Sequence, residues 1–376
     1  MKITIRVDAS YAMGHGHVMR CLTLAEAFRK RGAQVVFVCR EHEGHLCGRI
    51  EERGFSTFRL PKINIQCNDR SSYAAWIGAS WQEDFEQTRA AIQDTGQRSD
   101  WLVADHYGLD ERWESSLRSC VARIMVIDDL ADRVHDCDLL LDQNLVAQMQ
   151  HRYAGKVPLS CALLLGPEYA LLQPLYAELH DRVLPREGPI RRILIYFGGA
   201  DSTNMTGRSL AAFIHLNRPD ITVDVVFAAD SPHATNIHKQ VAGHSNIHIH
   251  SNLPSLAPLM ANADLAIGAG GATSWERLCL GLPSLVVTLA ENQRPVAQYL
   301  HESGLIHWIG DEGQVDQQTI AATLVRVLSM NSLIDWSQQC SRICNGQGAS
   351  LTINAMEIAS DNMAGAGPCA ANAPQS

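Results

Sequence analysis

Two imidazoles alternate with glycines near the start of the chain, in the run Gly14-His15-Gly16-His17. Imidazole accepts or releases a proton near neutral pH, so this run is suited to acid–base chemistry. The alternating, β-branched residues 2–7 predict a short strand that Asp8 ends. Apolar side chains at helical spacing from position 18 predict a helix, which the basic run 29–31 and a glycine close. Because a glycine turn between a strand and a helix presents free backbone N–H groups, we expect it to form one wall of an active site.

A second glycine turn, over residues 268–273, follows a predicted strand at 265–267 and opens a predicted helix that runs through Leu280. Its backbone amides and the dipole of that helix are suited to a diphosphate. Glu276 lies one turn into the helix, where it can accept hydrogen bonds from the vicinal hydroxyls of a ribose. The alternative is that Glu276 is only a first-turn acid stabilised by the helix dipole. The neighbouring glycines favour the ligand-binding interpretation. Further on, Asn292 and Gln293 follow the next strand with amides that can contact a sugar.

The elements that must position these residues alternate between strand and helix. Strands are predicted over 34–39, 55–60, 101–104, 124–127 and 138–141, and helices over 83–94 and 111–122. Such alternation predicts an α/β fold with a parallel, doubly wound sheet. Aspartates recur where strands end, at Asp8, Asp105, Asp128 and Asp142. Ligands bind outside the carboxyl ends of such strands, so these aspartates line a shared pocket or, alternatively, only cap the following helices.

The same alternation begins again in the second half, and 376 residues are enough for two domains. Strands are predicted over 192–197, 222–227, 247–250 and 284–289, and helices from 204 and over 255–262, 293–303 and 317–328. We predict a first domain over 1–182, a charged, proline-containing linker over 183–190 and a second domain over 191–360. An amphipathic helix at 350–358 is expected to pack back on the first domain. The last residues, 361–376, are expected to form a disordered tail.

Composition excludes several classes of protein. A net charge of −9 argues against a nucleic-acid partner, which normally requires a basic face. Eleven cysteines, an odd number without a CxxC pair, predict free thiols in a reducing compartment rather than disulfides. The amino end lacks an apolar signal segment, and the apolar runs are far shorter than a membrane span. We therefore expect a cytoplasmic monomer that acts on a small molecule and does not insert into membranes.

Two other kinds of site fit the first glycine turn less well. A nicotinamide-binding fingerprint, G-x-G-x-x-G, needs a third glycine where Met19 stands, so a dehydrogenase is disfavoured. His15 and His17 could hold a metal ion, but they are only two residues apart on a turn and no H-E-x-x-H pattern is present. We therefore expect neither a metal nor a cofactor.

Seven motifs together resemble a known family. They are Asp8-Ala-Ser, the run 14–24 from Gly14 through His17-Val-Met-Arg-Cys, Asp105-His-Tyr-Gly-Leu-Asp110, Val126-Ile-Asp-Asp-Leu130, Leu165-Gly-Pro-Glu-Tyr-Ala-Leu171, Phe197-Gly-Gly and Ile267-Gly-Ala-Gly-Gly-Ala-Thr-Ser-Trp-Glu-Arg277. The sequence is similar to the UDP-2,4-diacetamido-2,4,6-trideoxy-β-L-altropyranose hydrolases of pseudaminic acid biosynthesis and flagellin glycosylation. The resemblance covers residues 1 to about 358.

The resemblance implies a two-domain GT-B-like fold in which the second domain holds UDP and the first faces the sugar. His17 then corresponds to the catalytic base. The residues expected to bind the sugar are Asp8, Gly14, Gly16, Arg20, His106, Tyr107, Tyr169, Asn292 and Gln293. The residues expected to bind the nucleotide are Gly199, Gly270, Gly271, Ala272, Thr273 and Glu276. One departure is Ala272, which stands where a serine is frequent in such loops and removes a possible hydroxyl contact to phosphate.

Simple chemistry agrees with this expectation. A nucleoside diphosphate leaves as a stable anion, so the paired carboxylates of ordinary glycosidases are unnecessary. One base that activates water, together with groups that hold the diphosphate, is sufficient for metal-independent hydrolysis of the sugar C1–O bond with inversion. Two alternatives stay open: a glycosyltransferase that uses a UDP-sugar donor, and a non-catalytic nucleotide-sugar binding protein.

Overall fold

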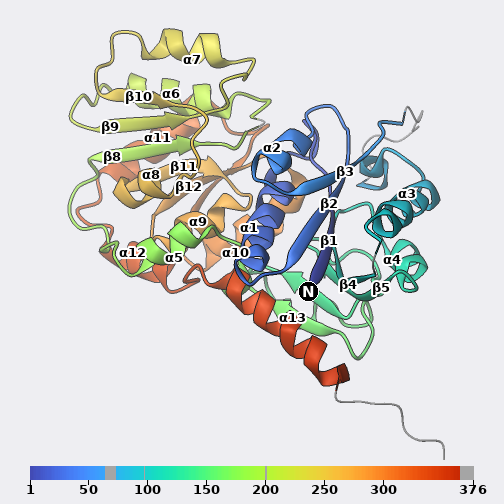
Figure 1. Cartoon of the computed structure of the whole chain (residues 1–376). Coiled ribbons are helices and arrows are strands. Elements are labelled where there is room, and N and C mark those ends of the chain that lie inside the picture. The colour runs from blue at the N-terminus through green and yellow to red at the C-terminus, as the bar shows by residue number, and fades with distance from the viewer. Residues whose placement is uncertain (64–72, 97, 200, 365–376) are drawn as a thin grey trace, which may run out of the picture.

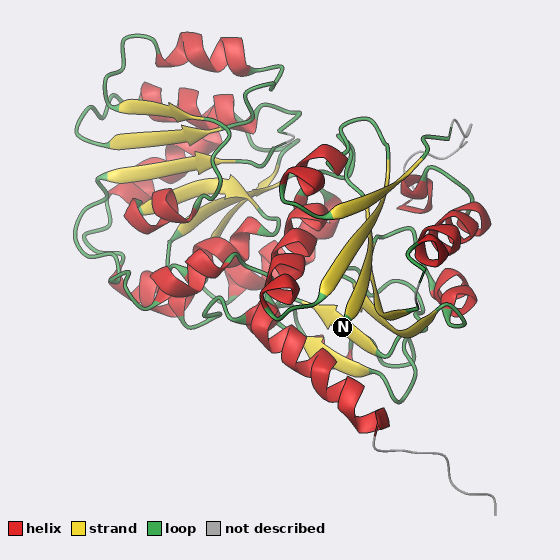
Figure 2. Cartoon of the chain, viewed as in Figure 1, coloured by secondary structure: helices red, strands yellow, loops and turns green. Residues whose placement is uncertain are grey.

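A computed structural model describes residues 1–63, 73–96, 98–199 and 201–364. It contains two parallel sheets, one in each half of the chain, and each sheet has helices on both of its faces (Figures 1 and 2). The predicted fold class, two doubly wound α/β units of the GT-B kind, is confirmed.

The first sheet has the strand order β3-β2-β1-β4-β5-β6-β7, and every neighbouring pair is parallel. Its strands are β1 (Lys2–Val7), β2 (Gln34–Arg40), β3 (Ser56–Leu60), β4 (Ser99–Asp105), β5 (Val121–Ile127), β6 (Leu139–Asp142) and β7 (Ala162–Leu165). Its helices are α1 (Gly16–Lys30), α2 (Cys47–Glu52), η1 (Tyr73–Ile77), α3 (Trp81–Asp94), α4 (Glu111–Leu117), η2 (Met149–His151) and η3 (Pro167–Tyr169). The chain winds outward from β1 in one direction and then restarts at β4 on the other side, so the winding reverses between β1 and β4.

The second sheet has the order β10-β9-β8-β11-β12-β13 and is also wholly parallel. Its strands are β8 (Arg192–Tyr196), β9 (Thr222–Val226), β10 (Ile247–His250), β11 (Leu265–Ala269), β12 (Ser284–Thr288) and β13 (His307–Asp311). The remaining helices are α5 (Pro174–His180), α6 (Met205–His215), α7 (Ala234–Val241), α8 (Ala257–Asn262), α9 (Thr273–Cys279), η4 (Glu291–Gln293), α10 (Arg294–Glu302), α11 (Gln317–Leu328), α12 (Ile334–Ser341) and α13 (Gly348–Ala364). Here the winding reverses between β8 and β11.

One sequence expectation about local structure was wrong. The helix predicted over 111–122 ends at Leu117, because Val121 pairs with Ser99 and belongs to β5. In β1, Thr4 and Arg6 are as buried as their apolar neighbours. Helices cover both faces of a doubly wound sheet, so polar residues in its central strands are enclosed.

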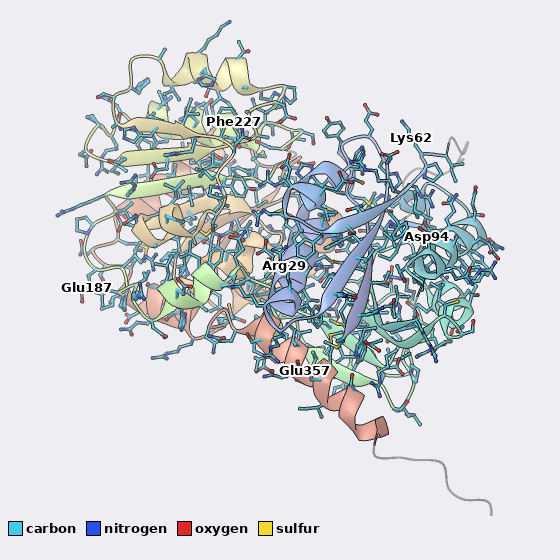
Figure 3. The ribbon with its side chains drawn as sticks, viewed as in Figure 1. Arg29, Lys62, Asp94, Glu187, Phe227 and Glu357 are labelled. Atoms are coloured by element: carbon cyan, nitrogen blue, oxygen red, sulfur yellow. The ribbon has the colours of Figure 1, made fainter. Side chains whose placement is uncertain are left out.

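The chain passes between the two halves at two places that touch each other. Leu171 packs in the apolar cluster of the first sheet, whereas Leu172 and the following α5 pack in a cluster of the second half. The chain returns before α13, which lies against α1 and carries Glu357 (Figure 3). Glu357 pairs at 2.7 Å with Arg31, the residue that follows α1. At Gly348 a Cβ atom would come within 2.3 Å of the Ala170 carbonyl oxygen, so the two passages are in backbone contact.

The predicted boundaries at 183–190 stay a prediction. Helix α13 continues through Ala364, four residues into the predicted tail, and the rest of that tail, 365–376, lies outside the described residues.

Candidate active site

The turn after β1 in the first half lies against the turn after β8 in the second half, where the two sheets reverse their winding. In open α/β sheets, ligands bind outside the carboxyl ends of the strands at such points. His15 and His17 follow β1, and Gly199 follows β8. The ring of His15 lies against Gly199, where a Cβ atom would be 2.9 Å from His15 Nδ1. This contact brings the reversal point of the first sheet directly against that of the second.

His17 and Asp105 form a buried pair at the centre of this region. His17 lies in the first turn of α1, and Asp105 is the last residue of β4. Nδ1 of His17 is 2.6 Å from Oδ1 of Asp105. A carboxylate only accepts hydrogen bonds, so Nδ1 carries the proton and Nε2 is the ring nitrogen with a free lone pair. This orientation leaves Nε2 as the atom that can act as a base.

Arg20, one turn further along α1, keeps Asp105 charged. Its Nε and Nη2 atoms both donate to the Asp105 carboxylate at 2.6 Å. Burial by itself would raise the pKa of Asp105, but the charge of Arg20 and the interaction with His17 hold that pKa far below its usual value. Arg20 lies behind the base, because all of Asp105 and most of Arg20 are inaccessible, and its predicted contact with the sugar stays a prediction.

Tyr107 connects the base to the second half of the chain. Its ring meets the His17 ring edge to face with centroids 4.6 Å apart. Its hydroxyl donates to Asp129 at 2.9 Å and lies 3.5 Å from Nδ2 of Asn292, which belongs to the other half. Tyr73 and Trp76 pack against the Tyr107 ring at 5.1 and 5.7 Å, so an aromatic surface stands beside the predicted base.

In the second half, the turn after β11 contains a buried acceptor without a partner. Oε2 of Glu276 is inaccessible and makes no hydrogen bond. Burial raises the pKa of Glu276 to about 7, although Tyr176 and Arg277 favour its ionised form. A buried carboxylate oxygen that accepts no hydrogen bond destabilises the folded protein, and the adjacent hydroxyls of a ligand would supply the missing donor. The predicted role of Glu276 in binding a ribose is consistent with this vacant acceptor.

Arg277 supports the same turn from beneath. Its guanidinium donates to the Ala269 carbonyl at 2.8 Å, to Ser274 Oγ at 3.0 Å and to Thr273 Oγ1 at 3.2 Å. Burial lowers the pKa of Arg277 to about 10. The guanidinium thus holds the glycine turn in shape and places a positive charge under it.

Four of the remaining predicted nucleotide residues lie at this turn, and the fifth lies at the turn after β8. The described residues of the set follow β8 or span β11 and α9: Gly199, Gly270, Gly271, Ala272 and Thr273. Gln293 lies against them, with its Nε2 atom 3.6 Å from where a Cβ of Gly271 would stand and its Oε1 atom accepting from Leu289 N. Gly14 and Gly16 form the opposing turn of the first half.

Three residues predicted to bind the sugar have other surroundings. Asp8 is wholly enclosed, with Arg6 bound to both carboxylate oxygens at 2.6 and 2.8 Å. His106 is buried beside Asp8, its Nδ1 accepts from Gly108 N, and burial lowers its pKa to about 4, so it stays neutral. Tyr169 packs on the apolar cluster that α1 and α13 share. In this structure Asp8 and His106 support the strand ends, and their contact with the sugar stays a prediction.

The other strand-end aspartates are also satisfied within the protein. Asp128 accepts from Ala131 N at 2.7 Å and pairs with Arg133, and Asp142 accepts from Asn144 N at 2.9 Å and bonds to Arg152. Both acids are therefore satisfied at turns. Neither caps the helix that follows, whose N-cap is Gln148, so the capping alternative does not describe them.

Sequence reasoning missed Asp129, which accepts from Arg20 Nη1 at 2.7 Å as well as from Tyr107. It also missed Arg277. Both sit inside quoted motifs. Asp129 pairs with Arg20, which is 109 residues away, and local spacing carries no signal for such a pair. Arg277 bonds within its own turn, three to eight residues away. The residues described contain no group of three or more metal-binding side chains, and none of their helices is long and apolar enough to cross a bilayer.

Comparison with known proteins places this site in context. Residues 197–337 match the family described as glycosyltransferase family 28 C-terminal domain. The chain is 26% identical over 305 residues to the UDP-2,4-diacetamido-2,4,6-trideoxy-beta-L-altropyranose hydrolase of Campylobacter jejuni, covering 81% of this chain and 97% of that protein. It is 25% identical over 300 residues to an uncharacterised protein of Methanocaldococcus jannaschii, and that match covers 78% of this chain and 57% of the archaeal protein.

Among solved structures, the fold is similar to that of MurG from Acinetobacter baumannii. The TM-score is 0.63 at 11% sequence identity, and the match covers 95% of this chain and 99% of MurG. The architecture is that of GT-B proteins. These comparisons establish the fold and distant homology to a UDP-sugar hydrolase, and they leave the reaction of this chain to be proposed.

Proposed function

We propose that this protein is a hydrolase that cleaves the sugar C1–O bond of a UDP-sugar, with UDP-2,4-diacetamido-2,4,6-trideoxy-β-L-altropyranose as its substrate. The observation that carries the proposal is the buried His17–Asp105 pair, held at 2.6 Å. Two residues before His17, the ring of His15 lies against Gly199 of the second half. A non-catalytic sugar-nucleotide binder would not need an imidazole oriented in this way. The substrate's identity rests on the distant relative and on the quoted motifs.

The reaction follows from the roles of the groups. Nε2 of His17 takes a proton from a water molecule as the water oxygen attacks the anomeric carbon. The C1–O bond to the diphosphate breaks with its electron pair on oxygen, and UDP leaves as an anion. Attack from the face opposite the leaving group inverts the anomeric centre. General-base catalysis of this kind typically contributes about 10²–10⁴ in rate.

The leaving group is held by the second half. The unpartnered oxygen of Glu276 would accept from the ribose hydroxyls. The turn over 270–273, supported by Arg277, would hold the diphosphate. Fixed donors that stabilise a departing anion often supply the greater part of an enzyme's rate enhancement. We propose that these groups suffice without a divalent cation.

Label from oxygen-18 water tests bond cleavage and metal dependence together. The protein is incubated in labelled water with EDTA and a panel of UDP-sugars, and UDP and the sugar are analysed by mass spectrometry. We expect UDP release in EDTA from the diacetamido-trideoxy substrate, with the label in the sugar alone. Label in UDP would mean attack at phosphorus, and loss of activity in EDTA would mean a required cation. Either result would overturn the proposed mechanism.

The match of residues 197–337 to a glycosyltransferase domain favours a second candidate function, transfer of the sugar to an acceptor. A transferase would release UDP slowly in water alone and much faster when an acceptor is added. A hydrolase would release UDP at the same rate in both cases. The sugar product is also analysed with and without acceptors. Sugar attached to an acceptor and free of label from water indicates a transferase, whereas labelled free sugar indicates a hydrolase.

A further inference from the structure

Five groups around the base form a closed circuit. His17 bonds to Asp105, Arg20 binds Asp105 through two nitrogens, and Arg20 Nη1 donates to Asp129 at 2.7 Å. Asp129 Oδ2 also accepts from the Tyr107 hydroxyl at 2.9 Å, and the Tyr107 ring packs edge to face on the His17 ring. The circuit has two arms. One runs from Asp129 through Arg20 and Asp105 to Nδ1 of the imidazole, and the other runs from Asp129 through Tyr107 to the imidazole ring face; Oδ2 of Asp129 joins them.

We propose that Asp129 is a positioning residue for the base, and that its charge influences the pH at which the base takes up a proton. This inference rests on the proposed function, because it concerns the same imidazole. Asp129 does not contact His17, so it acts only through Arg20 and Tyr107. Nothing in the sequence resemblance gives it this role.

The first arm sets the geometry of Arg20. The guanidinium spans two carboxylates that come from the ends of neighbouring strands, β4 and β5. Its Nε and Nη2 atoms face Asp105, and its Nη1 atom faces Asp129. A planar guanidinium held at both sides cannot rotate about its own axis, so the Asp105 oxygen that bonds to His17 stays in place.

The second arm sets the position of the Tyr107 ring. Its hydroxyl bond to Asp129 prevents the ring from swinging away from His17, and Tyr73 and Trp76 support its other side. Burial raises the pKa of Tyr107 well above its usual value, so the hydroxyl stays a donor. The imidazole is therefore confined from its face as well as from Nδ1.

The circuit carries a net negative charge beside the imidazole. Two carboxylates and one guanidinium give a net charge of −1 while the imidazole is neutral, and the charge becomes zero when His17 takes up a proton. The other groups that face the circuit add little. Burial raises the pKa of the Cys21 thiol and lowers that of His106, so both are neutral. Arg152, which reaches the Asp129 carbonyl at 3.1 Å, is paired with Asp142.

Neutralising Asp129 therefore changes the net charge of the circuit from −1 to zero. The imidazolium form of His17 would then be less stable, and the acidic limb of the pH–rate profile should move to lower pH. At separations of about 7 Å and an effective dielectric constant near 20, one charge shifts such a limb by up to about 1.7 pH units, so we expect a shift of at least about one unit. A purely structural role for Asp129 would lower the rate without moving the limb.

The test compares Asp129→Asn with Tyr107→Phe and with Asp132→Asn, an exposed neighbour paired with Arg133. The measurements are kcat as a function of pH and the proton NMR titration of His17, assigned with His17→Phe. We expect Asp129→Asn to lose about 10- to 100-fold in kcat and to titrate at least about one pH unit lower. Tyr107→Phe should lose rate without moving the midpoint, and Asp132→Asn should match the wild type.

Two further readouts keep the outcome decisive. UDP affinity by calorimetry should stay within about twofold in Asp129→Asn, because the nucleotide residues lie in the other half. If that variant does not fold, Asp129→Ser is titrated instead. The NMR titration needs no substrate, so a wild type that releases no UDP refutes the proposed function alone. A His17 midpoint in the Asp129 variants equal to that of the wild type overturns this inference.

Discussion

Replacing Glu276 by Gln should make the free protein more stable and its nucleotide site weaker. The carboxylate has an inaccessible oxygen without a donor, and burial raises its pKa from 4.5 to about 7. The substitution keeps the shape of the side chain and removes its charge. It therefore separates the cost of a buried charge from the benefit of that charge to a ligand.

The effect on stability follows from linkage between ionisation and folding. Below pH 4.5 the carboxyl is protonated in both the folded and the unfolded state, so its ionisation does not change the free energy of unfolding. Between about pH 4.5 and 7 the unfolded chain ionises first, and the free energy of unfolding falls by about 1.4 kcal/mol per pH unit. The full difference between the two pKa values would lower the free energy of unfolding by about 3 kcal/mol. Partial exposure of the residue reduces this loss to about 2 kcal/mol. At pH 8, Glu276→Gln should therefore gain about 2 kcal/mol, or several degrees in Tm.

The effect on binding has the opposite sign. With a pKa of about 7, the carboxyl is about one-tenth ionised at pH 6 and nine-tenths ionised at pH 8. A ribose hydroxyl prefers the charged acceptor, so affinity in the wild type should rise about tenfold over this range. At pH 8, Glu276→Gln should weaken UDP by about 1–2 kcal/mol.

The assay combines thermal melting without ligand with calorimetry at pH 6, 7 and 8. UDP is compared with uridine, which has no phosphate to ionise near pH 6. Glu302→Gln, a change at an exposed acid of α10, serves as the matched control and should alter neither quantity. A lower Tm for Glu276→Gln, or an unchanged dependence of uridine affinity on pH, would refute the reasoning and leave Glu276 as a helix-start acid.

Three further predictions concern other parts of the structure. His17→Phe should lose about 10²–10⁴ in kcat while UDP affinity stays within a few-fold, measured by UDP release and calorimetry; near-normal turnover would move the role of base to His15. Arg6→Met should lower the free energy of unfolding in urea by about 3–5 kcal/mol, because the buried Asp8 would lose its arginine partner and Asp84 would keep only Arg40, and an unchanged midpoint would contradict this. Gly348→Ala should cost about 1–3 kcal/mol by the same measurement, because its Cβ would overlap the Ala170 carbonyl, and a stability equal to that of the wild type would show that the backbone contact relaxes.

Local patterns in the sequence predicted most of the fold. The strand over 2–7, the strand over 247–250 and the helix over 317–328 have the predicted bounds, and both glycine turns follow strands as expected. These features depend on residues close together in the chain. The shorter strand β7 and the helix α5 were not anticipated, because their few residues carry no clear period.

The site was less predictable because its hydrogen bonds join distant residues. Asp8 looked like an acid at a crevice, although Arg6 lies two residues before it and hence on the same face of the strand. That spacing was a signal that could have identified the ion pair. No such signal exists for Arg20 and Asp129, which are 109 residues apart. Only the sheet topology brings the ends of β4 and β5 to the same helix.

The double passage between the halves has a consequence for protein engineering. Neither half is one continuous stretch of chain, because 172–182 pack with the second sheet and α13 packs with the first. A chimera that exchanges the nucleotide half of this protein for that of another must therefore be joined near 171 and near 347, rather than at a single point in the middle of the chain. Since the two passages touch at Gly348, both junctions fall at one spot. A chimera joined in this way has both of its junctions at one point between the two halves. A junction at 183–190 would instead separate α5 from the core against which it packs.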